Sequence, residues 1–347
     1  MKIAIHEKSG GFSQGWIEYC KKNNIEHKIV NCYSNNIVKN LNDCDGLMWH
    51  FHHMNPKDVL FARQLLYAIE ISGKSVFPNF NTVWHFDDKV AQKYLLEGLD
   101  CPLIPSYVFY EKERALHWIE TTSFPKVFKL RRGSGAANVM IANSKRQAKK
   151  LIGQSFGRGF SPYNKLGSIK ERYYKLKNGK GSFTSLAKGV IRLVHTTEFA
   201  KIQGNERGYV YFQDFIPALD HDIRVIVIGD KAIAIKRLVR EGDFRASGSG
   251  RLQYDKHLFN EEIIKEAFSL SRKMESQSLA IDFIMVEGAP KILEISYGFP
   301  EGDFVNDCPG YWDNNLNWHN DYIDTEGWMV ENIVKEIERM SKKSVGE

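Results

Sequence analysis

The sequence is poor in the features that mark secreted, membrane-spanning or disulfide-bonded proteins. Its five cysteines are odd in number and widely spaced, without a C-x-x-C pair, and they indicate reduced thiols of the cytosol. The apolar stretch after Met1 ends at His6, which is too short for a signal-peptide core, and no later run reaches membrane-spanning length. We therefore expect a soluble, cytoplasmic protein with no membrane partner.

The chain also lacks the elements of a nucleic-acid-binding protein. Its net charge of +6 is concentrated in one place, because eleven Lys and Arg residues stand against three Glu residues between Leu151 and Gly208. This stretch carries a charge of +8 and leaves the remainder of the 347 residues near −2. No helical recognition element or set of base-stacking aromatic residues accompanies it. The basic stretch indicates an anionic ligand or a solvated loop, and we expect no nucleic-acid partner.

The order of apolar patterns predicts an α/β protein of several lobes. Strands alternate with helices through the first eighty residues or so, which predicts an open, mainly parallel sheet covered by helices. A helix closes at Gly98, and Pro102 and Pro105 mark a change of lobe. The predicted domains are residues 1–80, 81–215 and 216–347. The second contains a polar, basic insertion at 156–208, interpreted as a lid over an anionic substrate or as a solvated charged loop.

Two strands near the C-terminal end carry acidic residues. Asp282 lies in the run SLAIDFIMV, and Glu294 and Ser296 lie in the run PKILEIS. Side chains at i and i+2 share one face of a strand, so Glu294 and Ser296 can face one spot opposite Asp282. Mg²⁺ prefers oxygen ligands and is held by one or two carboxylates together with substrate phosphates. The cluster predicts a magnesium site, with two unrelated polar strand ends as the alternative.

Residues upstream of this cluster are typical of a phosphate- and nucleoside-binding cleft. Lys129 lies on a strand that runs into Gly133-Ser134-Gly135, whose backbone N–H groups can approach phosphate oxygens, although most such turns are only turns. A second strand ends before Pro217, where the peptide groups of Asp214, Phe215 and Ile216 can face adenine. Asp222 follows, at a position suited to accept hydrogen bonds from ribose.

Four segments in the same order resemble the ATP-grasp superfamily, and within it the RimK-type glutamate ligase and D-alanine–D-alanine ligase branch. They are FDDKVAQKYLLEGLDCPLIPSY, FPKVFKLRRGSGAANV, FQDFIPALDHDIRVIVIGDKAIAIKRLVREGDFR and AIDFIMVEGAPKILEIS. The resemblance runs from about Pro78 to Gly302. It implies an α/β fold, α+β in parts, in which an N-terminal open parallel sheet precedes two α+β lobes that clasp ATP.

The resemblance assigns roles to particular residues. ATP would be bound by Lys89, Lys129, Gly133, Ser134, Gly135, Gln213, Asp214, Phe215, Ile216, Asp222 and Lys236. Catalytic roles would fall to Arg245, near the transferring phosphoryl group or the acyl phosphate, and to Lys236 and Arg237. The metal ligands would be Asp282, Glu294 and Ser296, holding one or two Mg²⁺ ions or Mn²⁺, with Glu294 able to bridge two.

The sequence departs from the family pattern at three places. The family usually has asparagine where this chain has Ser296, and commonly another where it has Ser247. A serine side chain is shorter and offers one oxygen, which puts the second metal position in doubt. The glycine turn also contains Ala136-Ala137, where the family often has glycine, so close approach of a phosphate there is less certain.

The implied activity is an ATP-dependent carboxylate–amine ligase that forms an amide through an acyl phosphate. A kinase acting on a hydroxyl and a nucleotide-binding regulatory protein without turnover are the alternatives. The expected partners are small-molecule carboxylate and amine substrates, sugar- or peptide-linked ones included, and a homodimer is an expected assembly. Trp312 and Trp318 could face a sugar ring or pack a C-terminal cap. The histidines of WHFHH indicate a polar strand end better than a metal site.

Overall fold

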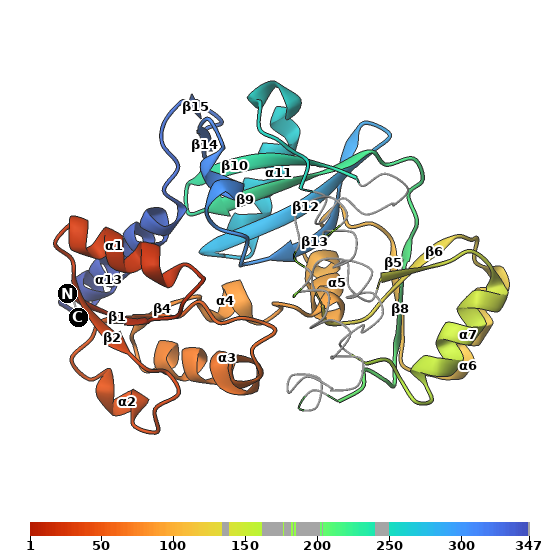
Figure 1. The fold of residues 1–347 in the computed structure, drawn as a ribbon, viewed down its shortest axis with the longest axis horizontal. Helices are drawn as coiled ribbons and strands as arrows, with labels where there is room; N and C mark the ends of the chain where they lie inside the picture. Colours follow the sequence, from red (N-terminus) through yellow and green to blue (C-terminus); the bar gives the residue numbers. More distant parts are fainter. Residues whose placement is uncertain are drawn as a thin grey trace. The chain divides into compact units, whose positions relative to one another are not determined.

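The computed structural model describes residues 1–133, 139–161, 204–239 and 250–345, with single positions at 176, 182, 184 and 202 (Figure 1). The chain divides into two compact units. The first comprises residues 1–86, 99–102 and 220–347, and the second comprises residues 87–98 and 103–219. The predicted ranges 1–80 and 216–347 fall almost wholly in the first unit. The division into three domains stays a prediction.

The first unit begins with a four-stranded parallel sheet in the order β2-β1-β3-β4. Its strands are β1 (Lys2–His6), β2 (Glu26–Val30), β3 (Gly46–Met48) and β4 (Ser75–Phe77), and its helices are α1 (Ser13–Lys22), α2 (Ile37–Asn40), α3 (Pro56–Ile71) and α4 (Phe80–Val83). Helix α3 begins where the Asn55 side chain accepts a hydrogen bond from Lys57 N and Pro56 occupies the first turn. The open parallel sheet predicted from the alternating pattern is confirmed.

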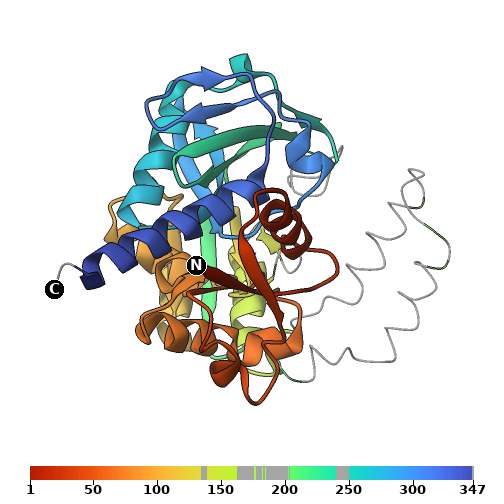
Figure 2. The same ribbon diagram turned by 90° about the vertical axis from the view of Figure 1, so that its left-hand side faces the viewer.

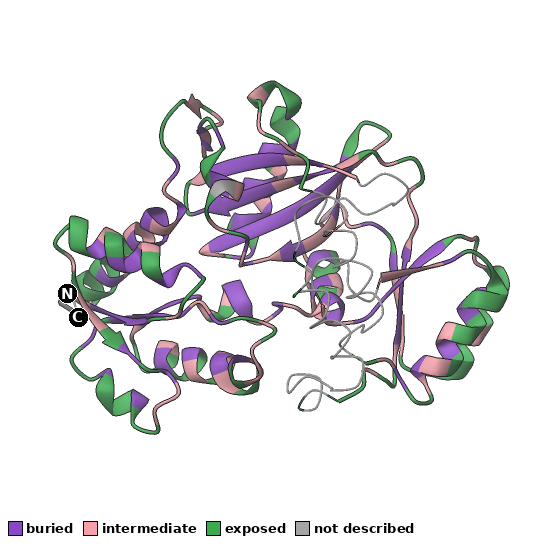
Figure 3. Cartoon of the chain, viewed as in Figure 1, coloured by how far each residue is buried: buried purple, intermediate pink, exposed green. Residues whose placement is uncertain are grey.

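The first unit also contains a seven-stranded antiparallel sheet in the order β13-β12-β9-β10-β14-β15, with β11 paired to β10. Its strands are β9 (His221–Ile228), β10 (Lys231–Leu238), β11 (Leu252–Gln253), β12 (Ser278–Val286), β13 (Ala289–Ser296), β14 (Tyr311–Asp313) and β15 (Trp318–His319). Strand β12 is buried along its first seven residues, as its nearly continuous apolar sequence requires (Figure 3). Asp282 is therefore a carboxylate inside an apolar strand.

Three helices and a 3₁₀ turn complete the first unit: η1 (Lys256–Leu258), α11 (Glu261–Lys273), α12 (Asp303–Asn306) and α13 (Thr325–Val345). Helix α11 packs on β9 and β12, and α13 packs on α1, β4 and β9 (Figure 2). Met329, Val330 and Ile333 of α13 enter the same core cluster as the N-terminal sheet. The C-terminal helix thereby joins the two sheets of this unit into one core.

The second unit is a four-stranded antiparallel sheet covered by helices. Its strand order is β5-β8-β6-β7, with β5 (Ser106–Phe109), β6 (Lys126–Lys129), β7 (Val139–Ala142) and β8 (Val210–Asp214). Its helices are α5 (Lys89–Gly98), α6 (Lys112–Thr121) and α7 (Lys145–Ser155). Phe128 and Phe212 pack against Ile119 of α6 and Ile152 of α7 in one core.

The structure differs from the sequence prediction at the ends of elements. The histidines of WHFHH were interpreted as the polar end of a strand, but β3 ends before them at Met48, and Phe51 N donates back to the Trp49 carbonyl where the chain turns. Strands β14 and β15 form a hairpin that pairs Trp312 with Trp318, in a part of the chain where no strand was predicted. Most of the basic insertion lies outside the described residues.

All five cysteines are unpaired, in agreement with their spacing. None of the described helices combines the length and the apolar composition needed to cross a membrane.

Candidate functional site

The two acids singled out in the sequence are direct neighbours in the antiparallel sheet. Asp282 of β12 lies opposite Glu294 of β13, and the register shifts between Asp282 and Phe283, as in a β-bulge. Cross-strand partners share one face of a sheet, so both carboxylates lie on the same side. Asp282 is only 8% exposed, and Glu294 is half-buried. The sheet therefore brings the predicted acid pair together.

Two arginines clamp Asp282. Arg224 of β9 donates from Nε to Oδ1 at 2.7 Å and from Nη2 to Oδ2 at 2.8 Å. Arg237 of β10 lies 2.8 Å from the same Oδ2 through its Nη2. Arg237 also binds Asp222 in a bidentate pair, from Nε at 2.6 Å and from Nη2 at 2.7 Å. Four charged side chains on three adjacent strands thus form one connected network of two acids and two arginines.

Arg224 is the member of this network that the sequence analysis did not select. The signal lies in the strand register, since Arg224 pairs with Asp282 and Arg237 pairs with Asp222 as cross-strand partners. Opposite charges on directly facing strand positions stabilise one another. Finding Arg224 required the order β12-β9-β10, which periodicity within single strands does not provide.

Asp282 stays ionised despite its burial. Burial alone raises the pKa of this carboxyl, but the charges and hydrogen bonds of Arg224 and Arg237 outweigh it and hold the pKa below its usual range. Asp222 is 5% exposed and Arg237 is 4% exposed, so these charges depend on one another for solvation. The network keeps Asp282 ionised opposite Glu294, and the two arginines balance the charges of the two acids of the network.

The donor set fits a divalent cation that is completed by phosphate oxygens. A carboxylate has about four acceptor positions, and the arginines use three on Asp282, which leaves one on Oδ1. The half-buried Glu294 is the cross-strand neighbour of Asp282. Among the described residues, no three His, Cys, Asp or Glu side chains gather as a complete metal site. Mg²⁺ is commonly bound by one or two carboxylates with substrate phosphates, which matches this pair.

Ser296 lies in a different position from the acid pair. It pairs with Ala280 rather than with Asp282. Its hydroxyl donates to the Gly298 carbonyl at 2.8 Å and accepts from Gly298 N at 3.2 Å. One lone pair is left for a metal, and the hydroxyl is already fixed in a turn. The assignment of Ser296 as a ligand stays a prediction.

In the second unit, Lys129 is held by a buried series of side-chain hydrogen bonds. Its Nζ donates to Gln213 Oε1 at 2.6 Å, and Gln213 Nε2 donates to Ser106 Oγ at 3.1 Å. Ser106 Oγ also accepts from the Tyr211 hydroxyl at 2.9 Å and donates to the Ile104 carbonyl at 2.8 Å. Lys129 is 6% exposed and Gln213 is 1% exposed. The predicted pair of Lys129 and Gln213 is therefore brought together on β6 and β8.

Lys89 lies at the start of α5, against the turn that follows β6. Its Nζ donates to the Gly133 carbonyl at 2.7 Å, and its backbone N–H donates to the Arg131 carbonyl at 2.9 Å. Gly133 N donates to Asp87 Oδ1 at 2.8 Å, and Gly133 has φ +114°, a conformation that favours glycine. These contacts join Lys89 to the glycine turn within one unit.

The predicted hinge follows β8. Asp214 pairs with Lys126 at 2.5 Å, and its backbone N–H donates to the Pro105 carbonyl at 2.9 Å. Phe215 and Ile216 are half-buried beyond the strand end.

In the first unit, Lys236 of β10 is half-buried beside Arg237 and pairs with Ile223. Ser134, Gly135 and Arg245, together with Ser247, lie outside the described residues.

The histidines after β3 are structural in their contacts. His50 Nδ1 accepts from Phe12 N at 3.1 Å, and its ring stacks on Phe12 at 4.0 Å between centroids. The His52 and His53 rings stack on each other at 4.4 Å. These contacts agree with a polar strand end.

Comparison with known proteins identifies the fold. A family model for a RimK-like ATP-grasp domain matches residues 177–298. A RimK-domain ATP-grasp protein from Sphaerobacter thermophilus is similar, with 14% identity and a TM-score of 0.57 over 95% of this chain and 98% of that one. D-alanine–D-alanine ligase from Bacillus anthracis complexed with ATP has 12% identity and a TM-score of 0.55 over 98% of both chains.

A third similar structure is the ATP-grasp ligase PsnB complexed with a minimal precursor, Mg and ADP. It has 11% identity and a TM-score of 0.53, over 97% of this chain and 98% of that one. Curated protein sequences give no significant match. The structural likeness extends along almost the full chain, and the family model covers the segment that contains β8 to β13. The chain therefore has the ATP-grasp fold that its sequence indicated, and a RimK-like ATP-grasp domain is matched at residues 177–298.

Proposed function

We propose that the protein is an ATP-dependent carboxylate–amine ligase that forms an amide through an acyl phosphate and releases ADP and phosphate. The observation that carries the proposal is the pair of Asp282 and Glu294, which lie opposite each other on an ATP-grasp sheet with two arginines holding Asp282 ionised. Solved relatives with this fold include ligases bound to ATP or to Mg and ADP. The fold and the acid pair together support a nucleotide-dependent ligase.

The chemistry proceeds in two balanced steps. A carboxylate oxygen of the substrate attacks the γ-phosphorus of ATP, and the bond to the β-phosphate oxygen breaks, so ADP leaves. The amine then attacks the carbonyl carbon of the acyl phosphate, phosphate departs with the electron pair of the C–O bond, and the amine loses a proton. Phosphorylation in this way turns the carboxylate into a reactive acyl donor. The protein chiefly aligns the reactants and neutralises their charge.

The residues of this chain have distinct proposed tasks in that scheme. Lys89, Lys129 and Lys236 would neutralise phosphate oxygens, and their ammonium groups suit that role as compact charges. Asp282 and Glu294 would hold Mg²⁺, which when bound supplies further charge neutralisation at the phosphates. The peptide groups from Asp214 to Ile216 would bind adenine, and Arg245 would lie near the transferring phosphoryl group.

Asp222 is engaged by Arg237 before any ribose is bound. Both of its carboxylate oxygens accept from Arg237, yet each retains acceptor capacity for a hydroxyl. We propose that Asp222 and Arg237 act first as the buried support of Asp282, and that a ribose contact would use the remaining lone pairs of Asp222.

The proposed substrates are a small carboxylate and an amine, the latter free or peptide-linked. One similar structure is a ligase complexed with a minimal precursor, and another is a D-alanine–D-alanine ligase. These two relatives support a proposal that includes both peptide-linked and free amines. A cytoplasmic location and a homodimer complete the proposal, since the cysteines are all unpaired and a similar carboxylase domain is recorded as a dimer.

Trapping with hydroxylamine tests the reaction class. We expect a set of small carboxylic acids, mixed with ATP, Mg²⁺ and hydroxylamine, to contain at least one acid that gives equal amounts of ADP and hydroxamate. Hydroxylamine replaces the amine in the second step, so hydroxamate reports an acyl phosphate. Colorimetric hydroxamate detection and coupled ADP release measure the two products. A phosphorylated product without hydroxamate would indicate a kinase, and ATP binding without turnover of any acid would favour a regulatory protein.

A further inference from the structure

Lys126, at the start of β6, faces the opposite side of its sheet from Lys129. Side chains alternate along a strand, so positions three apart lie on different faces. Phe128 lies on the same face as Lys126 and packs in the core that α6 and α7 cover. The cross-strand partner of Lys126 is Asp214, the last residue of β8, and the two side chains form an ion pair on this helix-covered face. Lys126 therefore has no part in the phosphate contacts proposed for Lys129.

Two aromatic rings and one carboxylate surround the ammonium of Lys126. Its Nζ lies 5.2 Å from the centroid of the Tyr107 ring, 5.9 Å from that of Trp118 and 2.5 Å from Asp214 Oδ1. Lys126 is only 5% exposed. The face of an aromatic ring attracts a cation, and more strongly when water is excluded. The ammonium is thus fixed in place by contacts with three other side chains.

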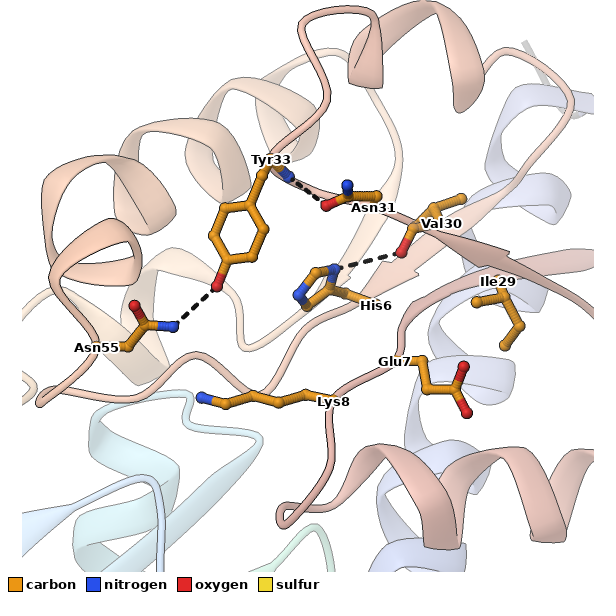
Figure 4. Close-up of a pocket in the computed structure, with 8 residues that line it drawn as sticks. All are labelled: His6, Glu7, Lys8, Ile29, Val30, Asn31, Tyr33 and Asn55. Atoms are coloured by element: carbon orange, nitrogen blue, oxygen red, sulfur yellow. Dashed lines mark hydrogen bonds between the residues drawn. The ribbon is translucent and has the colours of Figure 1, made fainter.

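Lys8, which follows β1, shows the more common placing of a lysine beside an acid. Its Nζ lies 3.5 Å from Asp58 Oδ2, and its side chain is 28% exposed. It lines a pocket of about 610 Å³ together with His6 and Tyr33 (Figure 4). Lysine is rarely buried as fully as Lys126 unless it is paired. The enclosure of Lys126 therefore depends on Asp214.

Stability alone does not account for a lysine at this position. Removing an ammonium from water carries a large desolvation penalty, and apolar residues of similar volume often replace a buried ion pair without loss of stability. An apolar side chain could also pack against Tyr107 and Trp118. What the ion pair adds is a fixed direction for the Asp214 side chain, which the ammonium holds on the helix-covered face.

Asp214 is held through both its side chain and its backbone. Its backbone N–H donates to the Pro105 carbonyl at 2.9 Å. In the part of the chain that the structure describes, Lys126 is the only side chain that donates to its carboxylate. The chain leaves the strand here and reaches Ala218, which has φ +58°. The two contacts of Asp214 therefore fix the peptide from which the hinge at residues 214–216 begins.

We propose that Lys126 is a positioning residue that acts through Asp214 and fixes the peptide groups of residues 214–216 so that they select adenine over guanine. This inference rests on the proposed function, in which those groups bind adenine. Adenine presents an amino donor and a ring acceptor at its edge, and guanine presents the reverse pair. A site built on such hydrogen bonds rejects the reversed pattern as long as its own groups stay in place.

Binding of ADP and GDP in the presence of Mg²⁺ tests the inference without turnover. Isothermal titration calorimetry of the full chain measures both dissociation constants. The unaltered protein should bind ADP at least about tenfold more tightly than GDP. Lys126→Met should reduce this preference about tenfold, chiefly through weaker ADP binding. A merely structural role would lower the thermal stability of the variant and leave the ratio of the two constants unchanged in the folded protein.

Three further variants show whether Lys126 acts through Asp214. Lys126→Arg keeps a charged donor for the carboxylate and should retain most of the preference. Asp214→Ala removes the carboxylate and leaves the backbone groups, so it should reduce the preference as Lys126→Met does. The double variant should be no worse than the more severe single one, because both changes remove the same contact. Thermal unfolding shows whether each variant is folded.

Lys149→Met is the matched control, since it removes an equal charge from an exposed position on α7 of the same unit. It should leave the preference unchanged. The inference is overturned if the unaltered protein binds ADP and GDP equally, if Lys126→Met keeps the preference, if the two single losses add, or if Lys149→Met loses as much. Each of these results leaves the ligase proposal intact. If the unaltered protein binds neither nucleotide, the proposed function itself is contradicted, and this inference with it.

Discussion

Glu294→Gln is expected to lower Mg²⁺-dependent ADP release by at least about 100-fold, since even groups that only support metal ligands change activity by up to that amount. Glu294 faces Asp282 across β12 and β13, and Asp282 has one acceptor position left by its two arginines. Glu294 would therefore provide most of the carboxylate contact to the metal. Gln keeps the size of the side chain and removes its charge. Steady-state ADP release over a range of Mg²⁺ concentrations measures the effect.

A matched control lies in the turn that joins the same two strands. Glu287 is exposed, and Glu287→Gln makes the same change of charge away from the acid pair. Its turnover should match that of the unaltered protein at every Mg²⁺ concentration. Equal turnover of Glu294→Gln and Glu287→Gln would show that the metal is held elsewhere.

Arg237→Met is expected to destabilise the protein by about 3–5 kcal/mol, the cost of removing one partner from a buried ion pair. Arg237 makes both hydrogen bonds of the bidentate pair with Asp222 and a further contact with Asp282. Without it, Asp222 is an unpaired charge that is 5% exposed. Chemical denaturation followed by tryptophan fluorescence measures the change in the free energy of unfolding.

Two comparisons separate the network from a general effect of changing β10. Lys236→Met alters the neighbouring, half-buried residue and should cost less than about 1 kcal/mol. Adding Asp222→Asn to Arg237→Met should recover part of the lost stability, because it removes the charge that was left unpaired. Asp222→Asn alone gives the reference loss of unfolding free energy for this test. If the double variant loses the sum of the two single-variant losses, the two side chains are not coupled.

The sequence could predict those features that depend on short-range pattern. The apolar runs around Asp282 and Glu294 located β12 and β13, and the two strands pair with Asp282 opposite Glu294. Lys129 lies on β6, in the run PKVFKLR that was predicted as a strand, although the strand ends at Lys129 rather than at Arg131. The ATP-grasp resemblance could be recognised because its four segments kept their order.

Other features depend on which strands become neighbours. Arg224 acquires its partner only when β9 lies between β12 and β10, an order that a single sequence does not state. The engagement of the Ser296 hydroxyl by Gly298 depends on the turn after β13, which has no distinct sequence signal. The pocket beside His6 likewise forms from the ends of β1 and β2 together with Asn55, far apart in the chain.

The fate of one oxygen atom tests the proposed reaction most directly. An acid that supports ADP release is prepared with ¹⁸O in its carboxyl group and is incubated with ATP, Mg²⁺ and an amine, and the released phosphate is analysed by mass spectrometry. In an acyl phosphate, the bridging oxygen comes from the carboxylate and leaves with the phosphoryl group. The account predicts one ¹⁸O in the phosphate formed with each amide. Phosphate free of ¹⁸O, formed together with amide, would contradict it.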